Sequence, residues 1–394
     1  MKILFLSQLL PLPLDAGPKI RAYYVLRHLA EAGHEVTLLC FVRPGDRESD
    51  VRELGRFCST VETVTLSRSR LKDVRDGLLS LVSATPFLIR RDRSAAMDRR
   101  LEQVAGRTSF DAVHADQLWM APYALSCRVP LKVLDQHNAV FKVPQRLAAQ
   151  QRNPVVGAVL RGEATKLASF ERSAVATFDR VVWVSEDDRR AFPSADRNRK
   201  GLHETIPIAI DPSERLPVER SRPFRVTFLG GLHWPPNAEG VRWFAERVWP
   251  KVAAAKPDAL FTVIGKGGPG QLGSRNGRGG MTVVGYVADL ERYLAETAAF
   301  IVPLHTGAGM RVKILDAWSW ALPVVSTTVG AEGIRATAGE DLLVADTADA
   351  FADALIRVLG DQALARRLSR AGRSTVEALY DWRKVYRAWD RVYQ

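Results

Sequence analysis

The chain has 394 residues, 46% hydrophobic and 25% charged, which excludes disordered and fibrous proteins and, at about 150 residues per domain, predicts two domains. It has no apolar run near the ~20 residues of a membrane-spanning helix, and its three cysteines lie too far apart for a disulfide framework or zinc knuckle, which fits a reducing cytoplasm. Its net charge of +12 favours an anionic partner: nucleic acid, phospholipid or a phosphate-bearing substrate.

The first 43 residues predict a strand, a loop, a helix and a second strand. Residues 2–6 are continuously apolar, as a parallel strand covered on both faces requires. Residues 11–18 are rich in Pro and Gly and predict a loop, after which helical spacing of apolar residues begins at Lys19 and ends at Gly33. Residues 35–41 form the next apolar run. Such a βαβ unit builds a parallel sheet that binds ligands at the carboxyl ends of its strands.

The same alternation continues to residue 210 and restarts after a linker. Further short strands are predicted at 61–66, 112–113, 131–134, 180–184 and 205–210. The linker is 211–223, which holds three prolines and mixed charge. Beyond it, strands are predicted at 224–229, 259–264, 281–284, 299–303 and 323–326, and helices at 237–255, 290–296 and 311–320.

This order predicts an α/β protein with two Rossmann-like, doubly wound domains that face each other across a cleft. We expect an N-terminal Rossmann-like domain at 1–210, the linker at 211–223 and a C-terminal Rossmann-like domain at 224–375. Residues 376–394 include a helix rich in Trp, Tyr and Arg that could pack back on the N-terminal domain.

Residues 68–100 break the alternation. This segment holds nine Lys or Arg against four Asp, on either side of apolar stretches at 77–82 and 86–89. Basic clusters beside an apolar helix fit in-plane contact with anionic lipid. The alternative is a helical hairpin that faces the core of the first domain and exposes its basic side to water.

Familiar nucleotide fingerprints are missing from the sequence. No G-x-G-x-x-G follows the first strand and no P-loop motif occurs, which disfavours dinucleotide oxidoreductases and P-loop NTPases. The glycine-rich stretch 265–270 fits a flexible loop better than a phosphate contact. No D-x-D triplet is present to hold a divalent ion between carboxylates, so we expect no metal and no cofactor.

The stretch 303–318 carries the strongest chemical signal. Small residues at 307–309 lie between a predicted strand and a helix, where the backbone can approach a ligand and the N–H groups of the first helical turn can bind phosphate. Arg311 and Lys313 add two cations at that turn, suited to a diphosphate. Asp316 lies one turn further and could accept hydrogen bonds from a ribose. Cations at a helix N-terminus oppose the helix dipole, so a purely structural role explains them poorly.

The stretch 307–316, with Ala321 to Thr327 and Gly330 to Gly333 after it, resembles the donor-binding signature of retaining GT-B glycosyltransferases of family 4. Residues 228–237 resemble a subgroup from bacterial exopolysaccharide and glycoconjugate clusters. So do Asp15 to Arg21 and Asp135 to Asn138. The resemblance covers nearly the whole chain.

The resemblance implies that 1–210 is the acceptor-binding domain and 224–375 the donor-binding domain, with a donor site built mainly from the second domain. Gly231 and the backbone of Gly309 and Met310 would contact phosphate, Arg311 and Lys313 would stabilise the leaving nucleoside diphosphate, and Asp316 would hold the ribose. Val287, in the segment 284–287, would lie where the family seats the base. From the first domain, Gly17 would approach the sugar diphosphate and His137 would face the transferred sugar.

Two departures from the family pattern concern the donor. The usual acidic pair is two glutamates with seven residues between them; here Asp316 stands at the second position and Ala308 at the first, so the first carboxylate is missing. A lysine that many members carry after the Gly230-Gly231 turn is also missing, and Arg311 with Lys313 could replace its charge.

His137 follows the apolar run 131–134, so its side chain should emerge at the carboxyl end of a strand, although Asp-Gln-His-Asn is also ordinary loop composition. His114 is best read as a loop or strand-end residue, and His114 with Asp116 could line the acceptor side.

The function that these features favour is transfer of a sugar, with retention and without metal, from a nucleoside-diphosphate sugar to a hydroxyl acceptor in polysaccharide, glycolipid or natural-product synthesis. The expected partners are that donor and acceptor and an anionic membrane surface reached from the cytoplasm, with no nucleic acid. A nucleotide-sugar epimerase on the same fold and a non-catalytic binding partner remain the alternatives.

Overall fold

The computed structural model describes residues 1–66, 69–192, 201–217, 224–267, 277, 279–287 and 289–394. Arg68, part of the predicted linker (218–223) and part of the glycine-rich stretch (268–270) lie outside the described residues. The chain divides into two compact units. The first consists of Met1–Ile210, Ala308–Met310 and Trp382–Gln394, and the second of Asp211–Gly307 and Arg311–Asp381.

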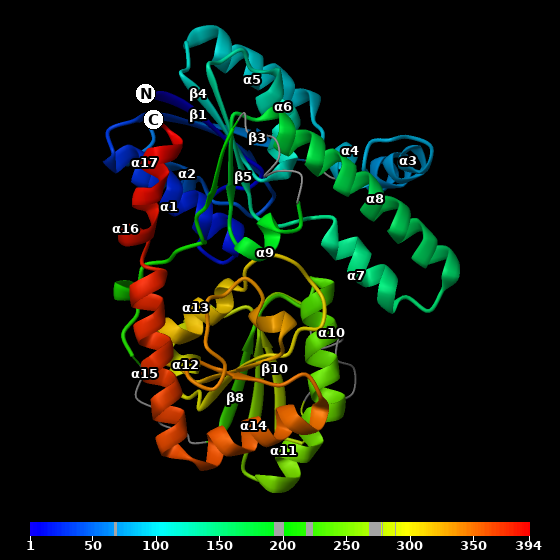
Figure 1. Ribbon diagram of the computed structural model, residues 1–394, viewed down its shortest axis with the longest axis vertical. Helices are drawn as coiled ribbons and strands as arrows, with labels where there is room; N and C mark the ends of the chain where they lie inside the picture. Colours follow the sequence, from blue (N-terminus) through cyan, green and yellow to red (C-terminus); the bar gives the residue numbers. More distant parts are fainter. Residues whose placement is uncertain (67–68, 193–200, 218–223, 268–276, 278, 288) are drawn as a thin grey trace. The chain divides into compact units, whose positions relative to one another are not determined.

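In its described part, the first unit holds a seven-stranded parallel sheet in the order β3-β2-β1-β4-β5-β6-β7 (Figure 1). Its strands are β1 (Lys2–Ser7), β2 (Glu35–Val42), β3 (Thr60–Thr65), β4 (Ala112–Asp116), β5 (Leu131–Gln136), β6 (Arg180–Trp183) and β7 (Leu202–Thr205). The strand order reverses between β1 and β4, and open α/β sheets bind ligands beside such a reversal.

Helices connect these strands. They are α1 (Gly17–Glu31), α2 (Glu48–Leu54), α3 (Arg70–Leu81), α4 (Phe87–Arg91), α5 (Ala95–Arg107), η1 (Leu118–Met120), α6 (Ala121–Ser126), α7 (Lys142–Gln150), α8 (Pro154–Thr177) and α9 (Glu186–Arg189). Alternate residues of β1 face opposite sides of the sheet. Leu4 and Leu6 belong to a core shared with α5, α6 and α8. Phe5 stacks on His114 with ring centroids 4.1 Å apart on the other side.

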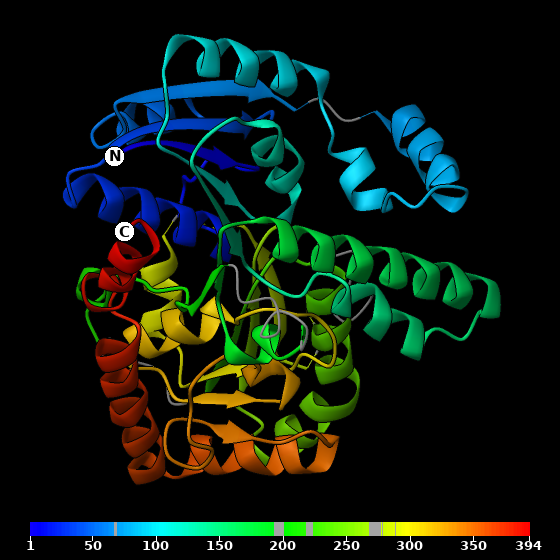
Figure 2. The same ribbon diagram turned by 45° about the horizontal axis from the view of Figure 1, so that its top comes forward.

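The C-terminal segment covers that second side together with α1 (Figures 1 and 2). It consists of α16 (Trp382–Val385), η7 (Tyr386–Ala388) and α17 (Trp389–Val392). Trp382 donates its backbone N–H to the carbonyl of Ile210 at 3.0 Å and stacks on Tyr24 of α1. The Tyr386 hydroxyl accepts from the backbone N–H of Ala209 at 3.2 Å. Residues far apart in sequence thus form one layer.

The predicted strand at 205–210 is wrong. The strand is β7 (Leu202–Thr205), and residues 206–209 lie outside any strand although they are buried or nearly so. Pro207 has no N–H to donate to a neighbouring strand, which prevents a ladder across this stretch. The carbonyl of Ile206 instead accepts a hydrogen bond from the guanidinium of Arg21.

The described part of the second unit holds a six-stranded parallel sheet in the order β10-β9-β8-β11-β12-β13. Its strands are β8 (Arg225–Leu229), β9 (Leu260–Ile264), β10 (Met281–Gly285), β11 (Ala299–Val302), β12 (Val324–Ser326) and β13 (Leu343–Val344). Its helices are η3 (Pro212–Glu214), α10 (Pro235–Trp243), α11 (Trp249–Ala255), α12 (Leu290–Ala295), α13 (Val312–Ser319), η6 (Val329–Ala331), α14 (Ala348–Gly360) and α15 (Gln362–Leu379). Two doubly wound parallel sheets confirm the predicted α/β class.

The predicted helix at 237–255 forms with one irregularity. A π-helical turn, Phe244–Val248, joins α10 to α11. Pro250 follows that turn and lacks the N–H that an α-helical bond to residue 246 would need, so the backbone widens there without ending the helix.

Among the described residues, none of the helices combines the length and the apolar composition that crossing a membrane requires.

Candidate functional site

Polar side chains gather where β1, β4 and β5 end. In the parallel register, Ser7 pairs with Asp116 and Asp116 pairs with Asp135, so the carboxyl ends of the three strands meet at one edge. The Ser7 hydroxyl donates to Asp116 at 2.8 Å. All three side chains are buried. Buried carboxylates need partners, and the next elements provide them.

Arg21 of α1 binds Asp135 through two parallel hydrogen bonds. Its Nε lies 2.7 Å from Oδ2 and its Nη2 lies 2.7 Å from Oδ1, while both side chains are fully buried. The Arg21 guanidinium also lies over the Trp389 ring, 5.2 Å from its centroid. Burial disfavours the charged carboxylate of Asp135, but Arg21 and His137 outweigh it and hold its pKa well below the usual range. Asp135 is therefore ionised.

His137 lies directly beyond β5, at the predicted strand end. Its Nε2 forms ion pairs with Asp116 Oδ1 at 2.8 Å and with Asp135 Oδ2 at 3.4 Å. Burial disfavours the imidazolium, but the two carboxylates outweigh it and raise the pKa of His137 to about 9. The other ring nitrogen, Nδ1, is buried and has no hydrogen-bond partner among the described residues. A charged imidazolium with one unused N–H can donate to a ligand oxygen.

The turn after His137 is held by a buried glutamate on α8. Glu171 accepts from the backbone N–H groups of Val140 at 2.8 Å and Phe141 at 3.0 Å and from the side chain of Gln136 at 2.6 Å. Its burial raises its pKa to about 8, although the backbone hydrogen bonds oppose this. Three donors converging on one side chain fix the path of the chain on either side of His137.

His114 does not lie where the sequence predicts. It is inside β4 rather than in a loop or at a strand end, and it is fully buried. Its ring stacks on Phe5, and its Nδ1 lies 2.6 Å from the Tyr393 hydroxyl. Burial lowers the pKa of His114 to about 4 despite the nearby carboxylates of Asp135 and Asp116, so the ring is neutral. These contacts place His114 in the packing between the sheet and the C-terminal segment.

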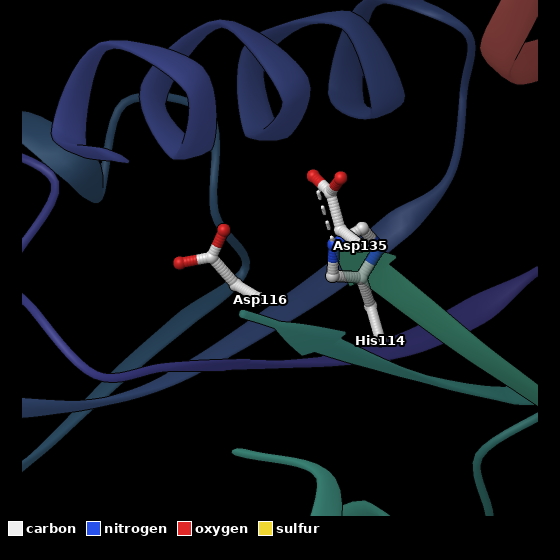
Figure 3. Close-up of side chains that lie close together, drawn as sticks. All are labelled: His114, Asp116 and Asp135. Atoms are coloured by element: carbon white, nitrogen blue, oxygen red, sulfur yellow. Dashed lines mark ion pairs between the residues drawn. The ribbon is translucent and has the colours of Figure 1, made fainter. Parts of the chain in front are cut away.

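His114, Asp116 and Asp135 offer ligand atoms within 4.8 Å of one another, a spacing that a metal ion could use (Figure 3). The dashed line in Figure 3 is the ion pair between His114 and Asp135, at 3.8 Å. The residues fit a metal poorly, however, because both oxygens of Asp135 are already bound by the guanidinium of Arg21. A cation would lie beside that guanidinium and beside the charged His137.

Gly17 is the first residue of α1, two residues before the predicted start of the helix at Lys19. Pro18 suits the first helical turn because its missing N–H has no partner there in any helix. Lys19 pairs with Asp15 at 3.1 Å and donates to the carbonyl of Leu12 at 3.2 Å, which ties the loop to the helix. Gly17 therefore lies at a braced helix start.

A second group of polar residues lies in the second unit, between the turn after β8 and α13. The Lys313 ammonium donates to Asn237 Oδ1 at 3.0 Å, and the Asn237 amide donates to the carbonyl of Gly231 at 2.9 Å. The Lys313 ammonium also lies 4.3 Å from the ring centroid of Phe228. These contacts bring the predicted Gly231 and Lys313 together.

The turn has room for these contacts only because residue 230 is glycine. Gly230 adopts φ 155°, and a Cβ there would lie 2.7 Å from the Lys313 ammonium and 2.9 Å from the Asn237 amide. Any side chain would displace both groups.

The electrostatics of Lys313 differ from those of an ordinary lysine. Burial disfavours its ammonium, and nearby Arg311 adds repulsion; together they lower the pKa of Lys313 to about 7, with Asp316 acting in the other direction. Arg311 is buried and precedes α13, with its guanidinium 3.9 Å from the carboxylate of Glu332. Two cations held so close, one of them partly discharged, suit a site that receives an anion.

Asp316 is paired within its own unit. Its carboxylate lies 3.0 Å from the guanidinium of Arg215, beside η3. Burial raises the pKa of Asp316, and Arg215 and Lys313 oppose that rise. A ribose would share Asp316 with Arg215.

Of the remaining predicted residues, Gly309 lies against the turn at His137: a Cβ at Gly309 would be 3.2 Å from the carbonyl of His137 and 2.9 Å from Asn138 Cβ. Val287 is partly exposed two residues beyond β10, next to Tyr286, whose ring lies 5.4 Å from the Lys266 ammonium. Gly309 adopts φ 77°, and both Gly309 and the buried Met310 belong to the first unit.

Sequence reasoning therefore named members of both groups but missed several residues that position them, among them Arg21, Glu171, Arg215 and Glu332. Arg21 and Glu332 stand inside the motifs that carried the family resemblance, so that signal was available. Glu171 and Arg215 stand in ordinary helical and linker sequence, where nothing marks a partner distant in the chain.

Comparison with known proteins gives a family-model match for most of the chain. Residues 17–214 match the model described as Glycosyltransferase Family 4, and residues 223–361 match that of Glycosyl transferases group 1. A relative described as an uncharacterized 44.6 kDa protein in the cps region of Klebsiella pneumoniae is 22% identical over 98% of both chains.

Solved structures share the fold over the whole length. Sucrose-phosphate synthase from Thermosynechococcus elongatus has a TM-score of 0.70 at 17% identity, covering 100% of this chain and 98% of that one. HepE from Anabaena, in complex with UDP-glucose, has a TM-score of 0.66 at 15% identity, covering 99% and 98%. At these identities the likeness concerns the fold, and it confirms the predicted GT-B type.

Proposed function

The chain belongs to glycosyltransferase family 4, and from that premise we propose that it transfers a sugar from a nucleoside-diphosphate sugar to a hydroxyl group. HepE, which shares the fold, is described in complexes with UDP and with UDP-glucose, so a UDP-sugar is the first donor to test. The acceptor we propose is a hydroxyl of a growing polysaccharide, a glycolipid or a natural product. Membership of a glycosyltransferase family argues against a non-catalytic binding partner. It also favours a transferase over the nucleotide-sugar epimerase.

The observation that carries the proposal is the arrangement around Lys313. Its ammonium lies beside the Gly230 turn, where burial helps to lower its pKa to about 7, and Arg311 stands two residues earlier, at the start of the same helix. A diphosphate bound there would restore the full charge of Lys313. Preorganised cations lower the barrier most when they act on charge that develops in the transition state, here on the departing diphosphate.

His137 is the candidate for orienting the donor sugar. Its Nε2 is bound by two carboxylates, which leaves Nδ1–H to donate to a sugar hydroxyl. We propose retention through departure and attack on the same face of the sugar. Asp116 and Asp135 are the carboxylates nearest to His137, and both are neutralised by cationic partners, which makes either a poor nucleophile.

We propose that the reaction needs no metal, because Arg311 and Lys313 supply the positive charge that a divalent ion supplies elsewhere. Activity should then persist in EDTA.

The test begins with thermal shift in UDP, GDP and dTDP, since a bound nucleotide stabilises the folded protein. Transfer is then measured with the sugars of the stabilising nucleotide, and the anomeric configuration of the product is read by NMR. Arg311→Ala should lower kcat by ~10²–10³ without lowering the melting temperature by more than a few degrees. Loss of activity in EDTA, an inverted anomer, or a wild-type kcat in Arg311→Ala would each contradict the corresponding part of the proposal.

A further inference from the structure

Helix α3 (Arg70–Leu81) exposes its apolar side to solvent. Leu71 is 83% exposed, Leu78 is 62% exposed and Val82, just beyond the helix, is 85% exposed. Val74 and Leu81 lie on the same side and are also exposed. These positions repeat at helical spacing, so they form one apolar stripe. Figures 1 and 2 show α3 at the periphery of the first unit, away from the strands.

The polar side of the same helix faces the protein. The buried residues of α3 are Asp76 and Ser80. Ser80 accepts a hydrogen bond from Lys166 of α8 at 2.6 Å and donates to Glu163 at 3.3 Å. A surface helix of a globular protein normally does the reverse, with its apolar stripe against the core. In the part of the chain that the structure describes, the apolar side of α3 is therefore left uncovered.

The surroundings of the stripe are basic. From Arg70 to Arg93 the chain carries six Lys or Arg (70, 72, 75, 90, 91 and 93) against three Asp (73, 76 and 92). Arg75 lies among the exposed apolar residues of α3, and its side chain is 66% exposed.

A cavity of about 540 Å³ adjoins α3, and its cations are the clearest pointer to the partner. Its lining includes Lys72, Arg75, Arg90, Arg93, Ile89 and Phe170. Asp76 also lines it and is paired with Arg75 at 3.0 Å. The Nε of Arg90 is buried and has no hydrogen-bond partner in the part of the chain that the structure describes. An unused guanidinium N–H in a basic cavity suits a phosphate oxygen.

We propose that α3 and this cavity form a docking surface for an anionic phospholipid bilayer. The apolar stripe of α3 enters the acyl region in the plane of the membrane, and the cavity receives a lipid phosphate, with Arg90 donating to it. Apolar burial and attraction between basic residues and anionic lipid act together in such contacts.

Charge argues for lipid over a second copy of this chain. Two copies paired through α3 would bring Arg70, Lys72 and Arg75 of one near those of the other, in a protein of net charge +12. An anionic bilayer neutralises the same cations.

The test is sedimentation of the full chain with vesicles of phosphatidylcholine containing 30% phosphatidylglycerol, and with phosphatidylcholine alone. We expect binding to the anionic vesicles that weakens steeply with salt, because exposed charges are screened within ~10 Å at 0.1 M. The triple variant Leu71→Gln, Leu78→Gln, Val82→Gln should reduce that binding at least tenfold and keep its melting temperature, since these side chains are exposed. Arg90→Gln should reduce binding to the vesicles that contain phosphatidylglycerol and should not change binding to vesicles of phosphatidylcholine alone.

A matched control replaces exposed apolar residues of the second unit: Leu216→Gln, Val344→Gln and Leu379→Gln should bind vesicles as the wild type does. The assay needs no donor or acceptor, so it stands independently of the proposed transfer reaction. No binding to anionic vesicles at low salt, or unchanged binding by the triple variant, would overturn the proposal. If the wild type were a dimer in solution and the triple variant a monomer, the stripe would be assigned to contact with a second copy of the chain instead.

Discussion

Arg21, Asp135 and His137 form a chain of buried charges in the first unit, and each depends on the next. Arg21 binds both oxygens of Asp135, and Asp135 with Asp116 keeps His137 protonated. Buried ion pairs often add little net stability, whereas removal of one partner leaves an uncompensated charge and costs about 3–5 kcal/mol. Their role here is geometric: they hold the imidazole with one ring nitrogen unused.

The transfer reaction should depend on that imidazole. We expect His137→Ala to reduce kcat at least ~100-fold, the lower range for a positioned polar group, and to leave the affinity for UDP nearly unchanged. The predicted diphosphate contacts, Arg311 and Lys313, belong to the second unit, which is why nucleotide binding should survive. Transfer kinetics and UDP titration check both parts.

His34→Ala is the control, because His34 directly precedes the amino end of β2, whereas His137 lies at the carboxyl ends of the strands. Wild-type transfer by His137→Ala with an intact fold would assign His137 to structure alone.

The lowered pKa of Lys313 predicts that the protein takes up a proton when it binds a nucleotide. In the free protein burial, then Arg311, lower its pKa to about 7, so at pH 8 most molecules carry a neutral amine. A bound diphosphate favours the ammonium and raises the pKa. Affinity for UDP should therefore fall as pH rises above 7, and binding at pH 8 should consume protons.

Calorimetry at pH 8 in two buffers of different ionisation enthalpy measures this uptake. The wild type should show different apparent enthalpies in the two buffers, and Lys313→Met should show equal ones. Equal enthalpies for the wild type would mean that Lys313 is either already charged or distant from the nucleotide.

At the scale of elements, β5 and α8 together determine where His137 points. The strand ends at Gln136, and Glu171 of α8 accepts from Gln136, Val140 and Phe141 on either side of the histidine. A buried donor left without a partner costs about 1–3 kcal/mol. The helix thus stabilises a turn that has no regular backbone ladder of its own.

Glu171→Ala should lower the free energy of unfolding by about 3 kcal/mol, since three donors lose their acceptor. Glu171→Gln should cost about half of this, because its amide oxygen can still accept from Gln136 and Val140. Urea unfolding followed by circular dichroism measures both. The rate of transfer should fall in the same order. Partial activity of Glu171→Gln would show that the loss in Glu171→Ala comes from the missing hydrogen bonds at the turn and not from the change in side-chain size.

Glu102→Ala, at an exposed position of α5, is the control and should change stability by less than ~0.5 kcal/mol. Equal stability of Glu171→Ala and the wild type would show that the turn holds without α8.

At the scale of the whole molecule, the C-terminal segment packs back on the sheet formed by the N-terminal part of the chain. The segment Trp382–Gln394 belongs to the first unit, although it begins 172 residues after Ile210. Trp389 is fully buried, its ring 5.4 Å from that of His114 and its face under the guanidinium of Arg21. The last residues of the chain therefore complete the layer that encloses the buried charges.

Trp389→Ala should cost about 3–5 kcal/mol, as removal of a buried tryptophan does. It should also reduce transfer, since Arg21 loses the ring that packs against it. Trp234→Ala, at a position that is 47% exposed, is the matched control and should leave stability nearly unchanged. Urea unfolding measures both, and a stable Trp389→Ala would show that α1 alone suffices to cover this face.

Apolar runs and turn residues predicted the two parallel sheets because strands buried on both faces must be continuously apolar. The strand at 205–210 failed by the same reasoning: an apolar, extended stretch met the pattern, yet Pro207 cannot pair and Arg21 takes a carbonyl there. The spacing of apolar residues predicts which residues are buried. It does not predict which backbone groups will pair in a strand.

The sequence by itself determined the α/β class and the family, and it singled out His137, Arg311 and Lys313 as candidate site residues, because short motifs carry these features in neighbouring residues. Only the tertiary structure decided that His114 is buried packing, that Arg215 pairs with Asp316 and that α3 turns its apolar side outward. Each of these depends on which distant residue lies opposite a side chain. A local sequence pattern predicts which kind of contact a side chain requires, whereas the fold decides which distant residue provides that contact.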